Sequence, residues 1–486
     1  MGTADALTPA GDVLAGDNPL KASYWLGLTD PRPLALFRIL FGLALCHDLF
    51  NYSRDLSAFL SDAGMLPRGV QAAPRVWSLF DLTGDPTTVA VLFAIGCVFV
   101  LSFTLGFKTR PSALLSWLFL TSLHTRNLYV TDGGDDLARN LMFLSIFADL
   151  AGCWSLDSRF GRKRRFVPVL PQRFLQLHVV LLYFVAARLK FRAGWLTHNI
   201  IFQALQLTGF TRPPALWLMQ SPLLCRLSTL TTLAMEWAFA FLALSPLRVG
   251  LCRALAIACG AGVQMAILLT MRVGIFTETM LASMALFARP EWFDWLGAKL
   301  GRDLSLAEVS PPLPALPLTE RTLLRSAGVA QLVLGGFLAF SFVTLAWGPF
   351  AARRFPLPHW TSVERQWLWL DQPMGLFDIV YEVPSWHADG VTTDGKRVDV
   401  LPIAIPDLVP VVRWRFSRWY KFTFKERERA FRFAALGDFT CRSYAEHAGQ
   451  RLRELTFFET RTPPKQPDGR ALPARTLERW HQVCTP

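Results

Sequence analysis

Long apolar stretches separated by short polar ones dominate the first 350 residues of the chain. A helix that crosses the roughly 30 Å hydrocarbon layer of a bilayer needs about 20 mostly apolar residues. Some of the stretches are short or contain polar residues, which suits interior helices that face one another. The pattern predicts an all-α, polytopic membrane helix bundle of about nine transmembrane helices. The nine segments are 33–50, 87–107, 111–125, 137–153, 173–190, 227–245, 249–270, 274–288 and 327–350.

The pattern changes in the last third of the chain, where apolar residues occur in shorter runs. Residues 378–384 and 396–403 have strand-like character, and Asp394-Gly395 between them is a turn signal. Two further segments have the composition of helices, 413–433 and 441–455. We therefore expect a small α+β domain outside the membrane. The predicted organisation is an N-terminal lead at 1–32, a transmembrane bundle at 33–350 and a C-terminal domain at 351–486.

Composition and charge support a membrane protein and suggest its orientation. Hydrophobic residues make up 52% of the chain, charged residues 18%, and mean hydropathy is +0.30. The net charge of +13 comes largely from loops, so membrane lipid is an expected partner and nucleic acid is not. Residues 158–173 contain six basic residues and no acidic one, which indicates a cytoplasmic loop. Alternation from this loop places the N-terminus in the cytoplasm and the C-terminal domain outside it.

The cysteines and the N-terminus add two further expectations. None of the eight cysteines lies in a CxxC or Cys/His pattern, so no metal site is predicted. Cys441 and Cys484 both fall in the C-terminal domain, where their pairing in a disulfide is left open by the sequence. The polar first 30 residues lack the pattern of a cleavable signal peptide, so the first membrane helix is expected to insert uncleaved.

Two ionisable residues within apolar segments are the first candidates for function. Lys190 ends one membrane-length run, and Glu236 lies midway along another, in TTLAMEWAFAF. An ionisable side chain inside a membrane is costly and is a functional-site hypothesis by default. Glu236 is expected to pair with a cation or to be protonated. Lys190 fits either a general base or an interfacial anchor beside Arg188 and Arg192.

Other polar residues near the helix ends have two interpretations each. Each either belongs to a site at the depth of the outer leaflet or is a charge solvated by water at a helix end. These residues are Asp48, Asp135, Asp136, Arg272 and Glu278. The remaining groups are expected to be structural: Arg38, Arg253 and the two core histidines His47 and His178.

The aromatic and basic string at 413–433 suits a membrane surface, a partner protein or a helix with one buried aromatic face.

Five strings, in this order and spacing, resemble the HTTM (horizontally transferred transmembrane) domain family, which includes vitamin K-dependent gamma-glutamyl carboxylase. The resemblance covers roughly residues 30–300. The strings are LALFRILFGLALCHDL (34–49), FLSDAGMLPR (59–68), TDGGDDLARNLMFLSIFADLAGCWSLD (131–157), YFVAARLKFRAGW (183–195) and RVGIFTETMLAS (272–283).

The resemblance implies a chemistry for Lys190, which falls at the position of the carboxylase's catalytic base. That lysine deprotonates a reduced quinone, which reacts with oxygen to give a base strong enough to take the γ-proton of a substrate glutamate before carboxylation. The implied cofactor is reduced vitamin K or menaquinol. Gln264 stands where the family's enzymes have a histidine, and glutamine cannot transfer a proton near neutral pH. The candidate catalytic residues are Lys190, Glu236 and Gln264; the candidate substrate- or cofactor-binding residues are Asp135, Asp136, Arg139, Trp195 and Glu278.

Two functions remain open on this basis. The first is a quinol-dependent carboxylase that modifies a secreted peptide or protein. The second is an accessory HTTM protein for maturation or export of a secreted peptide, as in the sporulation-delaying toxin system. A transporter is less favoured, because no paired broken helices are evident. The excess of arginine over lysine suggests a GC-rich, bacterial genome, so the bundle is expected in a bacterial membrane.

Overall fold

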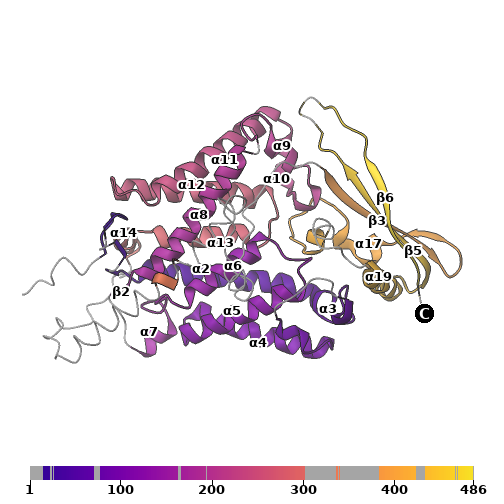
Figure 1. Ribbon diagram of the computed structural model, residues 1–486, viewed down its shortest axis with the longest axis horizontal. Coiled ribbons are helices and arrows are strands. Elements are labelled where there is room, and N and C mark those ends of the chain that lie inside the picture. The colour runs from indigo at the N-terminus through magenta and orange to yellow at the C-terminus, as the bar shows by residue number, and fades with distance from the viewer. Residues whose placement is uncertain are drawn as a thin grey trace, which may run out of the picture.

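The computed structural model describes a helical bundle and a smaller α+β unit (Figure 1). The described residues are 15–301, 335–337, 339 and 382–484, with internal gaps at 22–23, 26, 71–76, 162–165, 193, 423–432, 466 and 468.

The bundle is built from eight main helices and several short ones. The main helices are α2 (Arg32–Tyr52), α4 (Pro86–Leu105), α5 (Thr109–Arg126), α6 (Gly133–Ser145), α8 (Leu170–Arg192), α11 (Pro222–Leu242), α12 (Val249–Thr270) and α13 (Phe276–Ser283). The other helices in the described part of the bundle are α3 (Leu56–Leu60), α7 (Leu156–Phe160), α9 (Ile200–Ala204), α10 (Pro213–Met219) and α14 (Pro290–Leu300). The 3-10 turns are η1 (Ser53–Asp55), η2 (Arg68–Val70), η3 (Leu79–Asp81), η4 (Thr208–Phe210) and η5 (Met284–Phe287). Two short strands also pair, β1 (Leu28–Thr29) and β2 (Val167–Pro168).

Each of the first eight predicted apolar segments overlaps one of the main helices. Among the described residues, four helical stretches are long and apolar enough to cross a membrane: Arg32–Leu60, Pro86–Leu105, Leu170–Phe191 and Val249–Thr270. Segments 137–153 and 274–288 form the shorter helices α6 and α13. The ninth segment, 327–350, lies almost entirely outside the described residues. The chain is therefore a helical membrane protein, and nine spans remain a prediction.

Local sequence signals explain where the helices begin and end. The side chain of Asp85 accepts a hydrogen bond from the Thr88 amide at 2.7 Å, and Pro86 occupies the first turn of α4. Gly106, at φ 69°, ends this helix in the left-handed conformation. Asp132 and Asp135 form a reciprocal capping box at the start of α6. This role for Asp135 is structural, and it also fixes the position of the carboxylate.

Small residues allow close helix packing in the bundle. Helix α2 packs against α4 and α13. At Gly42, an added Cβ would lie 2.3 Å from Thr104 Oγ1 and 2.8 Å from Thr104 Cβ. Helix α11 packs against α8 and α12, where Tyr183 and Phe239 bring their ring centres to 4.3 Å.

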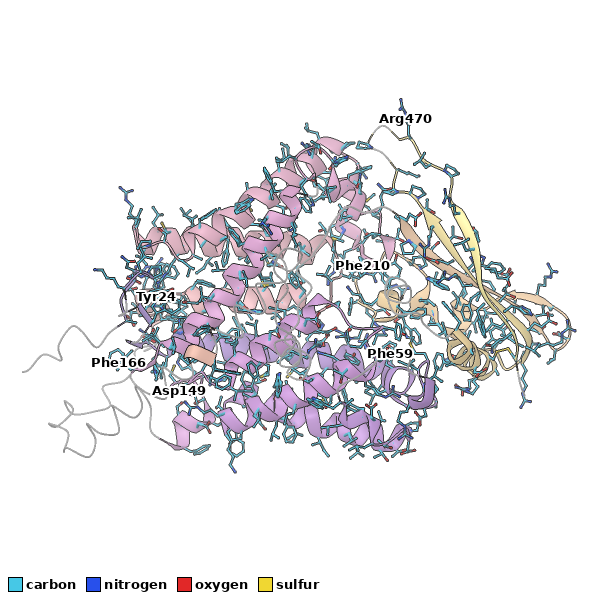
Figure 2. All side chains as sticks on the ribbon, in the orientation of Figure 1. Tyr24, Phe59, Asp149, Phe166, Phe210 and Arg470 are labelled. Atoms are coloured by element: carbon cyan, nitrogen blue, oxygen red, sulfur yellow. A yellow bond between two sulfur atoms is a disulfide. The ribbon has the colours of Figure 1, made fainter. Side chains whose placement is uncertain are left out.

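Different parts of the chain lie at the two ends of the bundle. Figure 2 shows Tyr24, Asp149 and Phe166 at one end and Phe59 and Phe210 at the other, next to the C-terminal unit. Tyr24, which precedes the first main helix, and Phe166, at the described end of the basic loop, thus lie at the same end, opposite the C-terminal unit, as alternation predicts.

The C-terminal unit is a four-stranded antiparallel sheet in the order β4-β3-β5-β6, with α19 packed against β5 and β6. Its core includes the rings of Trp386, Phe433 and Phe457. A disulfide joins Cys441 of α19 to Cys484 just after β6, so the pairing left open by the sequence is present. The elements are β3 (Val383–Thr392), β4 (Arg397–Asp399), α17 (Leu401–Ala404), η6 (Pro406–Leu408), α19 (Phe433–Ala448), β5 (Leu452–Thr462) and β6 (Arg475–Val483).

Some predicted elements of this unit are wrong in extent. The turn at Asp394-Gly395 is confirmed, but β3 begins at Val383, at the end of predicted segment 378–384, whose residues 378–381 lie outside the described chain. Strand β4 stops at Asp399, since α17 begins at Leu401 with Pro402 in its first turn. The predicted helix 441–455 ends early because Gly449 adopts φ +67° and β5 follows.

The predicted helix at 413–433 is wrong in its first residues. Residues 411–417 are not helical, and residues 423–432 lie outside the described chain. The backbone oxygens of Val411 and Arg415 accept hydrogen bonds from the Arg272 guanidinium, at 2.9 and 2.5 Å. These bonds to the bundle take the place of a helical ladder.

Candidate functional site

Lys190 of α8 and Glu236 of α11 form a buried ion pair between the two helices. Each side chain is only 5% exposed, and Lys190 Nζ contacts Glu236 Oε1. The other carboxylate oxygen, Glu236 Oε2, is buried and has no hydrogen-bond partner among the described residues. The expectation that Glu236 pairs with a cation is thus confirmed. A buried carboxylate oxygen without a partner requires an explanation, because nearly all such atoms are satisfied in native proteins.

The surroundings of this pair are apolar and aromatic. Lys190 Nζ lies 4.9 Å from the centre of the Trp195 ring, within the range of a cation–π contact. Trp195 itself belongs to a small buried cluster with Ala187, Ile200 and Leu233. In such surroundings the two charges depend on each other, and removing one partner costs about 3–5 kcal/mol. Lys190 is therefore not a solvated interfacial anchor.

Gln264 lies on the neighbouring helix α12 and binds a residue that sequence reasoning missed. Its Nε2 donates to the Tyr183 hydroxyl at 3.0 Å, and this hydroxyl donates to the Gly260 carbonyl at 3.1 Å. Gln264 Oε1 is buried without a partner in the described part of the chain. Tyr183 precedes Lys190 by seven residues, which places both on one face of α8. That spacing is the signal that could have identified Tyr183.

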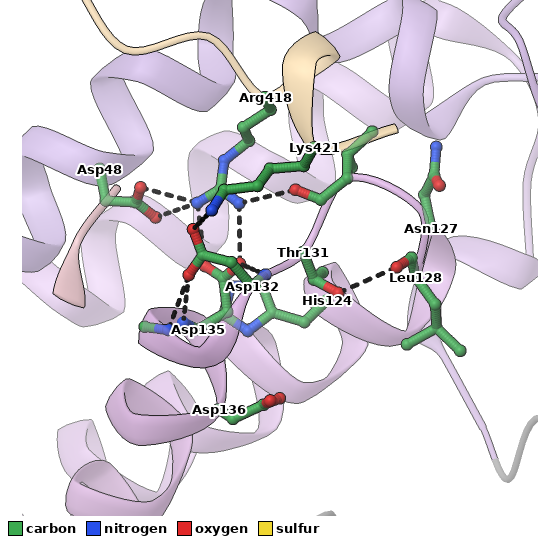
Figure 3. A network of polar contacts seen from close by, with 12 residues as sticks. Asp48, His124, Asn127, Leu128, Thr131, Asp132, Asp135, Asp136, Arg418 and Lys421 are labelled. Atoms are coloured by element: carbon green, nitrogen blue, oxygen red, sulfur yellow. Dashed lines mark hydrogen bonds and ion pairs between the residues drawn. The ribbon is translucent and has the colours of Figure 1, made fainter. Parts of the chain in front are cut away.

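A second group of predicted residues gathers around Arg418 (Figure 3). Arg418 Nη2 donates to both oxygens of Asp48, at 2.7 and 2.8 Å, and Nη1 donates to Asp135 at 2.9 Å. Nearby, Lys421 Nζ lies 3.1 Å from Asp132. Asp48 and Asp135 are buried, so the interpretation of these two as solvated helix-end charges is wrong. We refer to Asp48, Asp132, Asp135, Arg418 and Lys421 as the charge cluster.

Arg139 is linked to Asp135 through His124, and Asp136 pairs with Arg139. Arg139 forms an ion pair with Asp136, and its Nη1 donates to His124 Nδ1 at 3.0 Å. The other ring nitrogen of His124, Nε2, lies 3.3 Å from the Asp135 carboxylate. The structure thus brings together three predicted binding residues, Asp135, Asp136 and Arg139. These contacts involve neither Lys190 nor Glu236.

Asp48, His124 and Asp135 together have the spacing of a metal site. One ligand atom from each lies within 4.8 Å of the others. In this structure, however, the guanidinium of Arg418 binds both carboxylates, so an internal cation already neutralises them. Burial opposes the charge of Arg418, but Asp135 and Asp48 raise its pKa well above the usual value. Asp48, His124, Asp135 and Arg418 come from separate parts of the chain, so they do not form a motif that can be recognised in the sequence.

Glu278 belongs to neither the pair of Lys190 and Glu236 nor the charge cluster, and lies in the wall of a pocket. Its carboxylate lies 2.9 Å from His47 Nδ1, and His47 Nε2 contacts the Asn51 amide at 3.2 Å. The expectation that His47 is a core histidine is wrong, since its side chain is 56% exposed. His178 is buried as expected, and Arg38 binds the Leu150 carbonyl at 2.7 Å in a structural role.

The aromatic and basic C-terminal string is packed against the bundle in its described part. The ring of Trp419 packs at a tilt against Phe59, with ring centres 4.9 Å apart, and its Nε1 donates to Asp55 at 3.1 Å. Tyr420 packs edge-on against Phe210 at 5.0 Å. Of the three interpretations of this string, the buried aromatic face agrees with these contacts.

Comparison with known families gives one match. A family model described as the HTTM domain matches residues 28–292, which is more than half of the chain. Neither the curated proteins nor the solved structures contain a match. The matched range includes the helices that carry Lys190, Glu236 and Gln264, together with those of Asp48 and Asp135. The extent of this match shows that the chain belongs to the HTTM family.

Proposed function

We propose that this HTTM protein is a membrane enzyme in which Lys190 and Glu236 transfer a proton from a quinol. The observation that carries the proposal is the buried ion pair with one carboxylate oxygen left without a partner. A purely structural pair would be expected to satisfy all its polar atoms. An additional acceptor beside an amine suits a ligand that brings a hydroxyl group.

The residues present fit a quinol in their chemistry. Glu236 Oε2 can accept a hydrogen bond from a hydroxyl group, and Trp195 supplies an aromatic wall. When bound, reduced vitamin K or menaquinol would supply the reducing equivalents for a reaction with oxygen. The apolar cluster beside the pair excludes water, which protects a strongly basic centre from protonation.

The contact between Lys190 and Glu236 gives the amine a route to its neutral form. Transfer of one proton from Nζ to Oε1 converts the ion pair into a neutral amine and a neutral acid. Two charges are costly to keep in apolar surroundings, so the neutral pair is accessible there. The neutral amine of Lys190 is the general base, and Glu236 holds the proton meanwhile. Gln264 orients Tyr183 and does not itself carry a proton.

The finer activity we propose is carboxylation of a secreted peptide or protein. The C-terminal unit would then lie outside the cytoplasm, with the N-terminus inside it. The disulfide between Cys441 and Cys484 supports this orientation, because disulfides persist in oxidising compartments such as the periplasm or cell exterior.

A direct test measures quinol oxidation in isolated membranes. Membranes containing the protein are supplied with reduced vitamin K or menaquinol, and the epoxide is quantified by mass spectrometry. We expect Lys190→Met to abolish the epoxide. The matched control is Lys299→Met, since Lys299 also lies over a tryptophan, Trp295, at 4.5 Å but is exposed. Equal epoxide in both variants would contradict the role of Lys190.

A second candidate is the accessory role in maturation or export of a secreted peptide. One observation favours it: the C-terminal unit is held firmly on the bundle by Arg418 and ends in the exposed edge strand β6. An edge strand can pair with an extended peptide. In this case Lys190→Met would leave maturation of the client peptide intact, which separates the two candidates.

A further inference from the structure

A pocket of about 340 Å³ lies between the bundle and the C-terminal unit, apart from the Lys190 pair. Its walls are the last turns of α2, the stretch that leads into α13, and residues 414–416. This volume is at the lower end of the range for small-molecule sites. His47, Glu278 and Trp414 are among its lining residues.

The acidic groups of this pocket already have partners. Asp48 accepts two hydrogen bonds from Arg418, and Glu278 is paired with His47 at 2.9 Å. Neither carboxylate is therefore available as the main ligand for an incoming cation.

Two arginines in the pocket wall have charges that no described carboxylate neutralises by an ion pair. Arg54 lies over the Phe50 ring, 4.9 Å from its centre. Arg212 donates from Nη1 to the Leu268 carbonyl at 2.5 Å, while its buried Nε has no hydrogen-bond partner among the described residues. Guanidinium groups with unused donors suit an oxyanion such as phosphate or carboxylate. The pocket thus favours an anionic ligand.

The outer surface of α2 indicates where that anion comes from. One face of the helical stretch has residues at spacings of three or four: Leu40, Leu43, His47 and Phe50 of α2, followed by Arg54 of the turn η1. The apolar members of this face are exposed: Leu43 is 55% and Phe50 is 60% accessible. The face belongs to the helical stretch Arg32–Leu60, which is long and apolar enough to span a membrane. An apolar face that leads to a basic pocket matches a lipid with its headgroup at the membrane surface.

We propose that the pocket binds the phosphate of one anionic phospholipid through Arg54 and Arg212, with an acyl chain along the Leu40–Phe50 face of α2. The ring of Phe50 lies where headgroup and chain would meet. The site is independent of the proposed quinol chemistry, because it uses none of the residues around Lys190. A lipid here would contact both the bundle and the C-terminal unit and would strengthen their association.

Native mass spectrometry of the purified full chain in detergent tests this site. The protein is titrated with phosphatidylglycerol or with phosphatidylcholine of the same acyl chains, and bound lipids are counted. We expect one phosphatidylglycerol to be retained in preference to phosphatidylcholine. Arg54→Gln/Arg212→Gln should weaken its binding about thirtyfold, which corresponds to about 2 kcal/mol. The control is Arg110→Gln/Arg159→Gln, which removes two exposed arginines at the opposite end of the bundle.

Two further measurements keep the test decisive. Because Arg212 also holds a backbone carbonyl, the single variant Arg54→Gln, at an exposed position, should weaken lipid binding several-fold with an unchanged unfolding temperature. Soluble glycerol phosphate should compete poorly, since it lacks the acyl chain. Equal retention of both lipids, equal binding by the test and control double variants, or displacement by glycerol phosphate at the same concentration as lipid would overturn the proposal.

Discussion

At the residue scale, the protein places a lysine and a glutamate where each depends on the other. Lys190 and Glu236 are buried together, beside an apolar cluster that gives the charges little solvation. Their individual positions are visible in the sequence as ionisable residues in apolar runs. Their pairing is not, because 46 residues separate them and the sequence contains several other charges at similar depth. Tyr183 has a local signal in its seven-residue spacing from Lys190, but its contact with Gln264 of α12 is not visible in the sequence, because 81 positions separate the two residues.

Loss of one partner should destabilise the protein more than loss of both. We expect Lys190→Met to lower the free energy of unfolding by about 3–5 kcal/mol, because Glu236 is left buried without a cation. Lys190→Met/Glu236→Met should recover most of this stability, since two apolar side chains replace two charges of similar volume. Thermal unfolding in detergent measures both. A double variant that is less stable than Lys190→Met would contradict this account of the pair.

At the element scale, the apolar pattern predicts the positions of the eight main helices. Each of them needs apolar residues over several turns, facing either the other helices or the lipid. The pattern does not predict their lengths equally well. The stretch Phe276–Phe287, which includes α13, is apolar like the membrane spans but shorter. The end of a helix depends on its caps and on its neighbours. In the C-terminal unit, residues 411–417 are not helical, and the backbone oxygens of Val411 and Arg415 bind Arg272, which is far away in sequence.

The contact between α2 and α4 should be sensitive to a single added carbon. In Gly42→Ala the new Cβ would meet Oγ1, Cβ and Cγ2 of Thr104, all within 2.9 Å, so rotation of the threonine cannot relieve the clash. We expect a loss of about 1–3 kcal/mol in unfolding free energy. Gly69→Ala is the control, because nothing lies within 4 Å of its added Cβ. Equal unfolding temperatures for the two variants would show that the helices are less closely packed than described.

At the scale of the whole molecule, the charge cluster fastens the C-terminal unit to the bundle. Arg418 and Asp48 are 370 residues apart, yet Arg418 Nη2 donates to both carboxylate oxygens of Asp48. In the sequence, the outer acidic residues fit either a site or solvated charges. Their partner is a cation near the opposite end of the chain, and no local pattern in the sequence links it to them.

Removal of Arg418 should loosen this attachment. Arg418→Met leaves Asp48 and Asp135 buried without their shared cation, and we expect a loss of about 3–5 kcal/mol in unfolding free energy. Limited proteolysis should then cut the segment around residues 411–422 faster than in the wild type. Arg453→Met, which removes an exposed arginine paired with Glu454, should leave cleavage unchanged. Neutralising one acid in Asp48→Asn/Arg418→Met should restore part of the protection, and no difference between the Arg418 and Arg453 variants would argue against the fastening role.

The measurement that tests the central claim most directly is quinol epoxidation by the charge-swapped variant Lys190→Glu/Glu236→Lys. The swap preserves the ion pair between α8 and α11 but moves the amine to the other helix. We predict that the variant unfolds at nearly the wild-type temperature and that its epoxide formation falls roughly a hundredfold or more, as expected when a general base is displaced. Wild-type epoxide levels in the folded swap, or no epoxide from the wild-type protein itself, would contradict the assignment of Lys190 as the base.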